Sequence, residues 1–214
     1  MKKIVTLSFI FLLALNADAQ FIKGNKVLGL GLNFQTSKQE ADAPNQFNRV
    51  DNSLQFSTEL GFATRENRLN GFFVGAGFSN SKYEGSSSNI TNKSYSISGG
   101  YFTRAYKSLG KNFFVFGEGR VSLNYSQQKS SNFINPNFKQ YAASVGVYPG
   151  LAYKWNQKFL FEIRFADFVN AGYSFTKYDN GNNQTSTQNS FGIGTSLGLG
   201  YLNNIGIGAR WIIK

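Results

Sequence analysis

The chain has 214 residues and a formal net charge of +11, although only 15% of its residues are charged and 16% are aromatic. It contains no cysteine and no histidine. These absences exclude a disulfide framework, a thiol nucleophile and the histidine-based sites that most often supply a general base or bind a metal ion. The basic excess includes no run of Lys or Arg, so it favours anionic lipid headgroups over nucleic acid as its counter-charge.

The N-terminus has the pattern of a secretory signal peptide. Lys2 and Lys3 form a short basic region, residues 4–15 are apolar, and Ala17-Asp18-Ala19 supplies small residues for cleavage. The apolar run is too short for a transmembrane helix, which needs about 20 residues. We therefore expect residues 1–19 to be removed during export and residues 20–214 to form one domain.

The rest of the chain alternates between apolar residues and small or polar ones, which is the pattern of half-buried β-strands. In residues 113–125, for example, Phe113, Val115 and Val121 share one face, whereas Glu118 and Arg120 share the other. The alternating segments, in chain order, are Val27–Ser37, Ser53–Ala63, Gly71–Tyr83, Ser94–Arg104, Phe113–Tyr125, Tyr141–Trp155, Phe159–Tyr178 and Phe191–Ile213.

The connections between these segments alternate in length. Short connections are expected at residues 65–70, 107–112 and 156–158, and long polar ones at 38–52, 84–93, 128–139 and 179–189. In an antiparallel meander this rhythm puts all the long loops at one end, as in outer-membrane barrels. The sequence therefore predicts an all-β fold, an eight-stranded antiparallel up-and-down transmembrane β-barrel.

Two segments leave the number of strands open. Asp167 would fall on the apolar face of its strand, and a β-bulge at Ala166-Asp167-Phe168 would correct this. The last segment is longer than a bilayer requires, and a turn at residues 202–204 would divide it. A barrel of ten strands, in which both segments are split, is the alternative to eight.

Three features predict that the apolar face contacts lipid. The opposite face is rich in Gly, Ser and Ala, which suits the narrow interior of a small barrel. Most lysines lie at or beyond strand ends, and Tyr and Trp recur near strand ends on the apolar face, as aromatic girdles do. A soluble ligand-binding barrel would instead turn its apolar face inward.

Seven charged residues then share the lumenal face. An Arg that faced lipid at mid-depth would cost about 2–4 kcal/mol, whereas charges that face one another inside a barrel can pair. Counted from the short turns, all seven lie at similar depth. We predict a structural charge layer that closes the lumen, and no catalytic role for its members, which are Glu59, Arg104, Glu118, Arg120, Glu162, Arg164 and Arg210.

The segments FLFEIRFADFVNAGYSFTKY (159–178) and GLGYLNNIGIGARWIIK (198–214) carry a family resemblance. With the eight alternating segments, they resemble the outer-membrane β-barrel domain proteins common in Bacteroidota, similar in architecture to the small OmpX/OmpA-type barrels. The resemblance implies a monomer in the outer membrane of a Gram-negative cell, surrounded by membrane lipids and lipopolysaccharide and inserted by the outer-membrane assembly machinery. The chain ends in Trp211-Ile212-Ile213-Lys214, whereas many such barrels end in an aromatic residue.

The function that we expect is a structural or surface-interaction role, in adhesion or envelope integrity, with a ligand or protein bound through the outer loops. A small channel is the main alternative. A lipid-modifying enzyme is a further alternative, but the resembling enzymes use a His beside a Ser and an acid, and this chain has no His. We expect no catalytic residue, no cofactor, no metal and no nucleic-acid partner.

The membrane-barrel prediction can be tested by fractionation. The protein should sediment with membranes, and its migration on a gel should shift on boiling, because a folded barrel resists detergent until it is heated. A protein that stayed in the soluble fraction and showed no shift would contradict the prediction.

Overall fold

The computed structural model describes residues 21–39, 48–84, 89–131, 137–179, 185–195 and 205–213. The predicted signal peptide and the predicted turn at 202–204 lie outside these residues. The described part of the chain contains no helix that is both long and apolar enough to cross a membrane.

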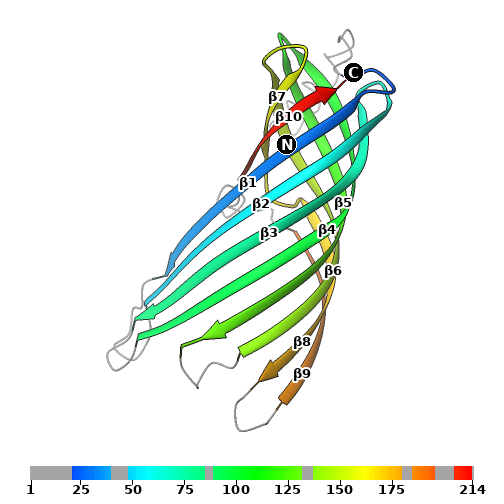
Figure 1. The fold of residues 1–214 in the computed structure, drawn as a ribbon. Coiled ribbons are helices and arrows are strands. Elements are labelled where there is room, and N and C mark those ends of the chain that lie inside the picture. Colours follow the sequence, from blue (N-terminus) through cyan, green and yellow to red (C-terminus); the bar gives the residue numbers. More distant parts are fainter. Residues whose placement is uncertain are drawn as a thin grey trace, which may run out of the picture.

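The described residues form one antiparallel sheet that curls into a tilted barrel (Figure 1). Neighbouring strands along the chain are joined in an up-and-down order, with the short turns at the upper end in Figure 1, where the arrowhead of β10 lies. The strands are β1 (Lys26–Gln39), β2 (Asn48–Arg65), β3 (Arg68–Glu84), β4 (Asn89–Gly110), β5 (Phe113–Ser130), β6 (Asn137–Lys154), β7 (Phe159–Arg164), β8 (Val169–Asp179), β9 (Thr185–Gly194) and β10 (Gly206–Ile213).

The ring closes through eight of these strands, as the sequence predicts. The order around it is β1-β2-β3-β4-β5-β6-β7-β10, and β10 returns to pair with β1. The closing register places Leu28 opposite Trp211 and Gly31 opposite Gly208. Two short turns use asparagines at positive φ, Asn67 at 54° and Asn112 at 72°, because Asn tolerates this left-handed conformation better than most residues.

The seventh predicted segment is interrupted where the sequence predicts a bulge. We call the end of the barrel with the short turns the inner end, and the end with the long connections the outer end. The half of β6 nearer the inner end pairs with β7, and the half nearer the outer end pairs with β8. The last pair of β6 with β7 is Gly150↔Arg164, and the first pair of β6 with β8 is Val147↔Val169. The segment between β7 and β8 therefore contains two more residues than the part of β6 that faces it. Because two residues are added, the even positions face inward on both sides of the interruption. Asp167 is half-buried and contacts the side-chain amide of Asn170, so it does not face lipid.

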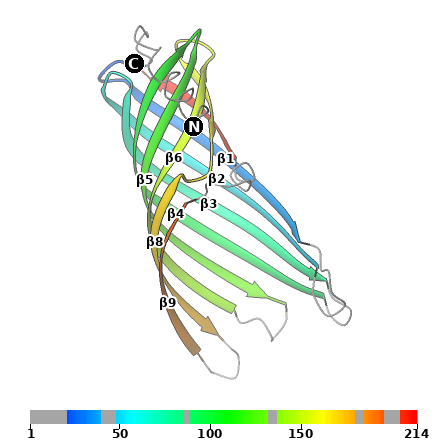
Figure 2. The ribbon, with the colours of Figure 1, turned by 180° about the vertical axis from the view of Figure 1, so that it is seen from behind.

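The last predicted segment is also divided, into β9 and β10. Among the described strands, β9 pairs only with β8 (Figure 2). Side chains on both faces of β9 are exposed. β10 pairs with β1 and β7. The splits that the ten-strand alternative requires are therefore present, but β8 extends the wall beyond β7 and adds no strand to the closed ring.

The strands extend further at their outer ends, toward the long connections, than the sequence predicts. Backbone pairing continues to Gln39↔Arg49, Glu84↔Asn89 and Asn137↔Asp179, inside segments that the sequence predicts to be long loops. The reason is that a β-ladder uses main-chain groups, so polar side chains do not end it. The long connections shrink to residues 40–47, 85–88, 131–136 and 180–184.

The apolar face of the sheet points outward. Val74 is 63% exposed, Ile97 61% and Phe191 71%, and similar residues follow on every strand of the wall. A belt of this extent greatly exceeds the apolar patches on soluble monomers and is the surface that lipid covers. Buried apolar residues gather instead inside the barrel at its inner end: Phe21, Val27, Leu69, Phe102, Phe114, Phe116, Leu160 and Ile212.

One close approach between β2 and β3 requires a glycine. A Cβ on Gly71 would lie 2.1 Å from the carbonyl oxygen of Leu60 and 2.8 Å from Cα of Gly61. We expect Gly71→Ala to lower the free energy of unfolding by about 1–3 kcal/mol, because neither backbone atom can move without breaking the ladder. Gly117→Ala, with open space around the new Cβ, is the matched control. Equal denaturation midpoints for the two variants would contradict this prediction.

Candidate functional site in the barrel lumen

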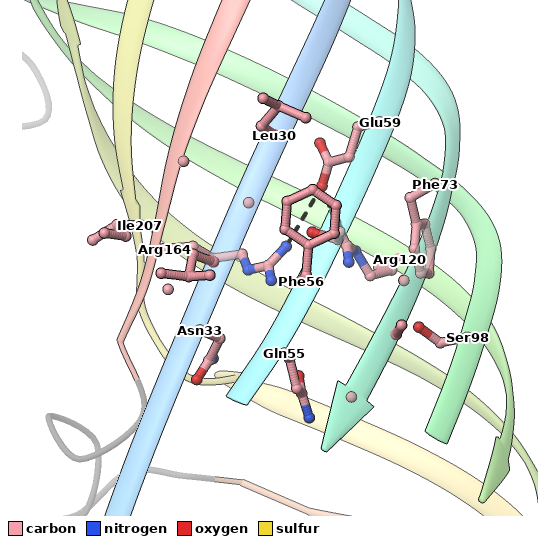
Figure 3. Close-up of a pocket in the computed structure, with 18 of the residues that line it drawn as sticks. Leu30, Asn33, Gln55, Phe56, Glu59, Phe73, Ser98, Arg120, Arg164 and Ile207 are labelled. Atoms are coloured by element: carbon pink, nitrogen blue, oxygen red, sulfur yellow. Dashed lines mark hydrogen bonds and ion pairs between the residues drawn. The ribbon is translucent and has the colours of Figure 1, made fainter. Parts of the chain in front are cut away.

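The structure brings all seven predicted charged residues into contact at mid-depth in the lumen. They project from five strands of the wall: Glu59 from β2, Arg104 from β4, Glu118 and Arg120 from β5, Glu162 and Arg164 from β7, and Arg210 from β10. We call this group the charge layer. Figure 3 shows Glu59, Arg120 and Arg164 of this layer, seen through the wall that β1 and β2 form.

Small residues on neighbouring strands make room for these long side chains. Gly29 of β1 pairs with Glu59 on one side and with Arg210 on the other. A Cβ on Gly29 would lie 2.8 Å from Nη1 of Arg210. Glu59 and Arg210 therefore meet across a strand that contributes no side chain at that level. Arg164 is flanked in the same way, by Gly150 and Gly206.

Arg104 occupies the centre of the charge layer and is only 2% exposed. Its Nε donates to Oε2 of Glu118 at 2.8 Å, and its Nη1 donates to Oε2 of Glu162 at 2.6 Å. Its Nη2 also contacts Glu118 and lies 3.5 Å from Oε2 of Glu59. One guanidinium thus contacts all three carboxylates of the layer.

Two further arginines link the same carboxylates from the sides. Arg120 donates from Nε to Glu118 Oε1 at 2.8 Å and from Nη2 to Glu59 Oε1 at 2.5 Å. Arg210 donates from Nε to Glu162 Oε2 at 2.6 Å and from Nη2 to Glu59. Each carboxylate therefore accepts from at least two guanidinium groups, as charges removed from water require.

Arg164 is held more loosely than the other three arginines. Its Nη1 lies 3.4 Å from Glu118 Oε1 and 3.8 Å from Glu59 Oε1, atoms that already accept from Arg120. Its side chain keeps 25% exposure. With four arginines against three glutamates, Arg164 is the excess cation, and it lies on the outer side of the layer (Figure 3).

Sequence reasoning missed Tyr106 and the aromatic rings around the charges. The Tyr106 hydroxyl donates to Oε1 of Glu162 at 2.5 Å and accepts from Nη1 of Arg104 at 3.1 Å. The Phe116 ring lies 4.6 Å from Cζ of Arg104, and the Phe73 ring 4.0 Å from Cζ of Arg120. Tyr106 follows Arg104 by two residues and so shares its face, which is the signal that would have found it.

The charge layer separates two unlike halves of the lumen. On its inner side lies the buried apolar cluster that includes Leu69, Phe102 and Leu160. On its outer side lie polar cavities, of which one of about 210 Å³ is lined by Gln55, Asn124, Arg164 and Asp167, among others. Among the described residues, no three His, Cys, Asp or Glu side chains are grouped closely enough to hold a metal ion.

Comparisons with known proteins identify the fold. No protein-family model and no curated protein sequence matches the chain. The crystal structure of the outer membrane protein OprG from Pseudomonas aeruginosa matches with a TM-score of 0.55 over 92% of this chain and 99% of that one, at 11% identity. This chain has the fold of a small outer-membrane β-barrel.

Two further solved structures are similar at lower TM-scores. Neisserial surface protein A matches with a TM-score of 0.39 at 12% identity, covering 88% of this chain and 97% of that one. A major outer membrane protein from Thermus thermophilus matches with a TM-score of 0.40 at 11% identity, covering 88% and 99%. The outward apolar belt of the present barrel agrees with the lipid-facing surface that such a fold requires.

The contribution of the charge layer to stability can be measured with two substitutions on the same face of β5. Glu118→Gln removes a buried negative charge that Arg104 and Arg120 share, so we expect the free energy of unfolding to fall by about 3–5 kcal/mol. Ser122→Ala removes the contact with the Ser144 hydroxyl at 2.7 Å and a hydrogen bond of 3.5 Å from Nδ2 of Asn124, a loss of about 1 kcal/mol. Denaturant titration in lipid vesicles compares the two, and equal midpoints would contradict a structural role for the layer.

Proposed function

We propose that this protein is a closed outer-membrane barrel with a structural or surface-interaction role, in which the outer end is the working surface and the lumen conducts nothing. The observation that carries the proposal is the filled cross-section at mid-depth. Arg104 and Glu118 are almost fully buried there, although both lie inside the ring and away from lipid. Their burial means that neighbouring side chains, and not water, surround these two groups and obstruct the lumen at this level.

The inner half of the lumen adds a second obstruction. Phe102, Phe116 and Leu160 are at most 2% exposed, and the Phe21 ring packs 5.0 Å from the Tyr106 ring across the inner end. An eight-stranded ring is only wide enough for side chains to fill. An ion would have to displace both the apolar cluster and a network of paired charges to pass.

The outer end supports a role at the cell surface. The paired strands continue beyond the apolar belt as polar extensions, so that Thr36 and Asn52, for example, meet in a hydrogen bond of 2.8 Å. These extensions continue the hydrogen-bonded wall beyond the apolar belt, up to the outer connections. A scaffold of this kind suits the binding of a surface ligand or protein, because rigid strands position the loops that they carry.

The remaining parts of the proposal concern biogenesis and setting. Residues 1–19 act as a signal peptide, and residues 20–214 are inserted as a monomer by the outer-membrane assembly machinery among lipids and lipopolysaccharide. The resemblance to Bacteroidota-type barrels supports this part.

The charge layer has a structural role in this proposal, and not a catalytic one. Every carboxylate of the layer accepts hydrogen bonds from guanidinium groups, and this supports a stabilising role.

Planar-bilayer recording tests the proposal. The folded, unmodified protein should add no discrete conductance above that of the bare membrane, because its lumen is filled at two successive levels. Regular, repeatable conductance steps that depend on the amount of folded protein would contradict a closed barrel and favour the channel alternative. Heat-unfolded protein added under the same conditions is the control for leaks caused by the detergent.

A further inference from the structure

Four lysines face one another on the outer wall of the barrel. Lys93 of β4 lies directly opposite Lys129 of β5, and Lys139 of β6 lies directly opposite Lys177 of β8. The strands β4, β5, β6 and β8 are adjacent, so the four residues form one continuous patch. All four are exposed. We call this patch the lysine band.

The described residues do not neutralise the lysine band. Within the described part of the chain, none of the four has a carboxylate at ion-pair distance. The acidic residue of β8 is Asp179, which lies two residues beyond Lys177 at the end of the strand. Like charges directly opposite on paired strands destabilise a sheet. Two such oppositions side by side, with no counter-charge at ion-pair distance among the described residues, make this part of the wall a favourable site for an anion.

The position of the lysine band identifies the kind of anion. Lys93 and Lys139 lie two residues from Tyr95 and Tyr141, toward the outer end and on the same lipid-facing side of the wall. The Tyr141 ring contacts the Tyr125 ring, with centroids 5.1 Å apart, and Tyr95 contacts Phe78 at the same distance. Aromatic girdles of this kind mark the level of the lipid headgroups.

A side wall at headgroup level is reached by lipid more readily than by a soluble macromolecule, which would approach the tips of the strands. We propose that the lysine band binds the phosphate groups of lipopolysaccharide in the outer leaflet. Adjacent strands are about 4.8 Å apart, so the band spans roughly 15 Å, enough for more than one phosphate. The inference rests on the proposed orientation in the outer membrane, with the long connections outside.

Binding of purified lipopolysaccharide to the folded barrel in a non-ionic detergent tests this. Replacing Lys93, Lys129, Lys139 and Lys177 together by Gln should weaken binding by well over tenfold, since each basic residue near an anionic lipid surface contributes about fivefold. The matched control replaces four exposed lysines at the inner end by Gln, Lys23, Lys26, Lys111 and Lys158, and should bind within about twofold of the unmodified protein. We call the protein with all four lysines of the band replaced the outer variant. Added salt should weaken lipopolysaccharide binding by the unmodified protein and by the control much more than it weakens binding by the outer variant.

Two further arms separate the sources of phosphate. Dephosphorylated lipopolysaccharide should bind the unmodified protein about as weakly as the outer variant binds the intact lipid. Inorganic phosphate should not compete at concentrations where the lipid saturates the protein, and equal affinity for both would overturn the assignment to lipid. If the fourfold variant does not fold, K93Q/K129Q and K139Q/K177Q each remove half of the band and should each cause part of the loss.

Unchanged binding by the outer variants, or equal weakening by the inner-end control, would overturn the inference. These outcomes are independent of the conductance test. A barrel that conducts ions but binds lipopolysaccharide through the lysine band would contradict only the closed lumen. A barrel that conducts no ions, but whose outer variants bind lipopolysaccharide as well as the unmodified protein does, would contradict only the inference about the lysine band.

Discussion

The pairing of buried charges inside a narrow ring is the interaction on which this structure depends. Three glutamates and four arginines from five strands share one level of the lumen, with Arg104 contacting every carboxylate. A single unpaired charge in such a place is very costly, because removing it from water is not offset by any nearby partner. Once all are present, the strands that carry these charges are linked to strands that are not their neighbours in the ring, such as β4 to β7 through Arg104 and Glu162 and β2 to β10 through Glu59 and Arg210. The charge layer thus ties together strands that share no backbone ladder.

The network requires small residues as much as charged ones. Gly29 lies between Glu59 and Arg210, and Gly150 and Gly206 flank Arg164. In a ring of eight strands the interior cannot hold a long side chain at every lumenal position. Alternating long and small residues around one level lets the guanidinium and carboxylate groups converge at the axis. The glycines of the inner face are therefore part of the charge layer, although they carry no charge.

Lipid surrounds one part of the barrel wall, and water and lipid headgroups surround another. The composition of the wall therefore changes along the barrel axis. At mid-depth, lipid outside requires apolar side chains, and charged side chains turn inward where they can pair. Beyond the aromatic girdle, water and headgroups allow polar and basic side chains on the outer surface, which is where the lysine band appears. The change from apolar to polar side chains does not interrupt the β-ladder, because its hydrogen bonds join main-chain atoms. This explains how strands continue through segments whose composition resembles loops.

The sequence alone determined which residues share a face, because the two-residue period of a strand places Glu118 and Arg120 together whatever their neighbours are. It also determined the antiparallel order and the outward apolar belt. Counting from the short turns placed the seven charges at similar depth, but it could not show which of them pair, since register depends on hydrogen bonding between segments far apart in the chain. Only the tertiary structure decided that Arg104 is the centre of the charge layer, that Tyr106 completes it, and that Gly29 admits it. The same limit hid the lysine band, because Lys93 and Lys129 become neighbours only when β4 and β5 are paired.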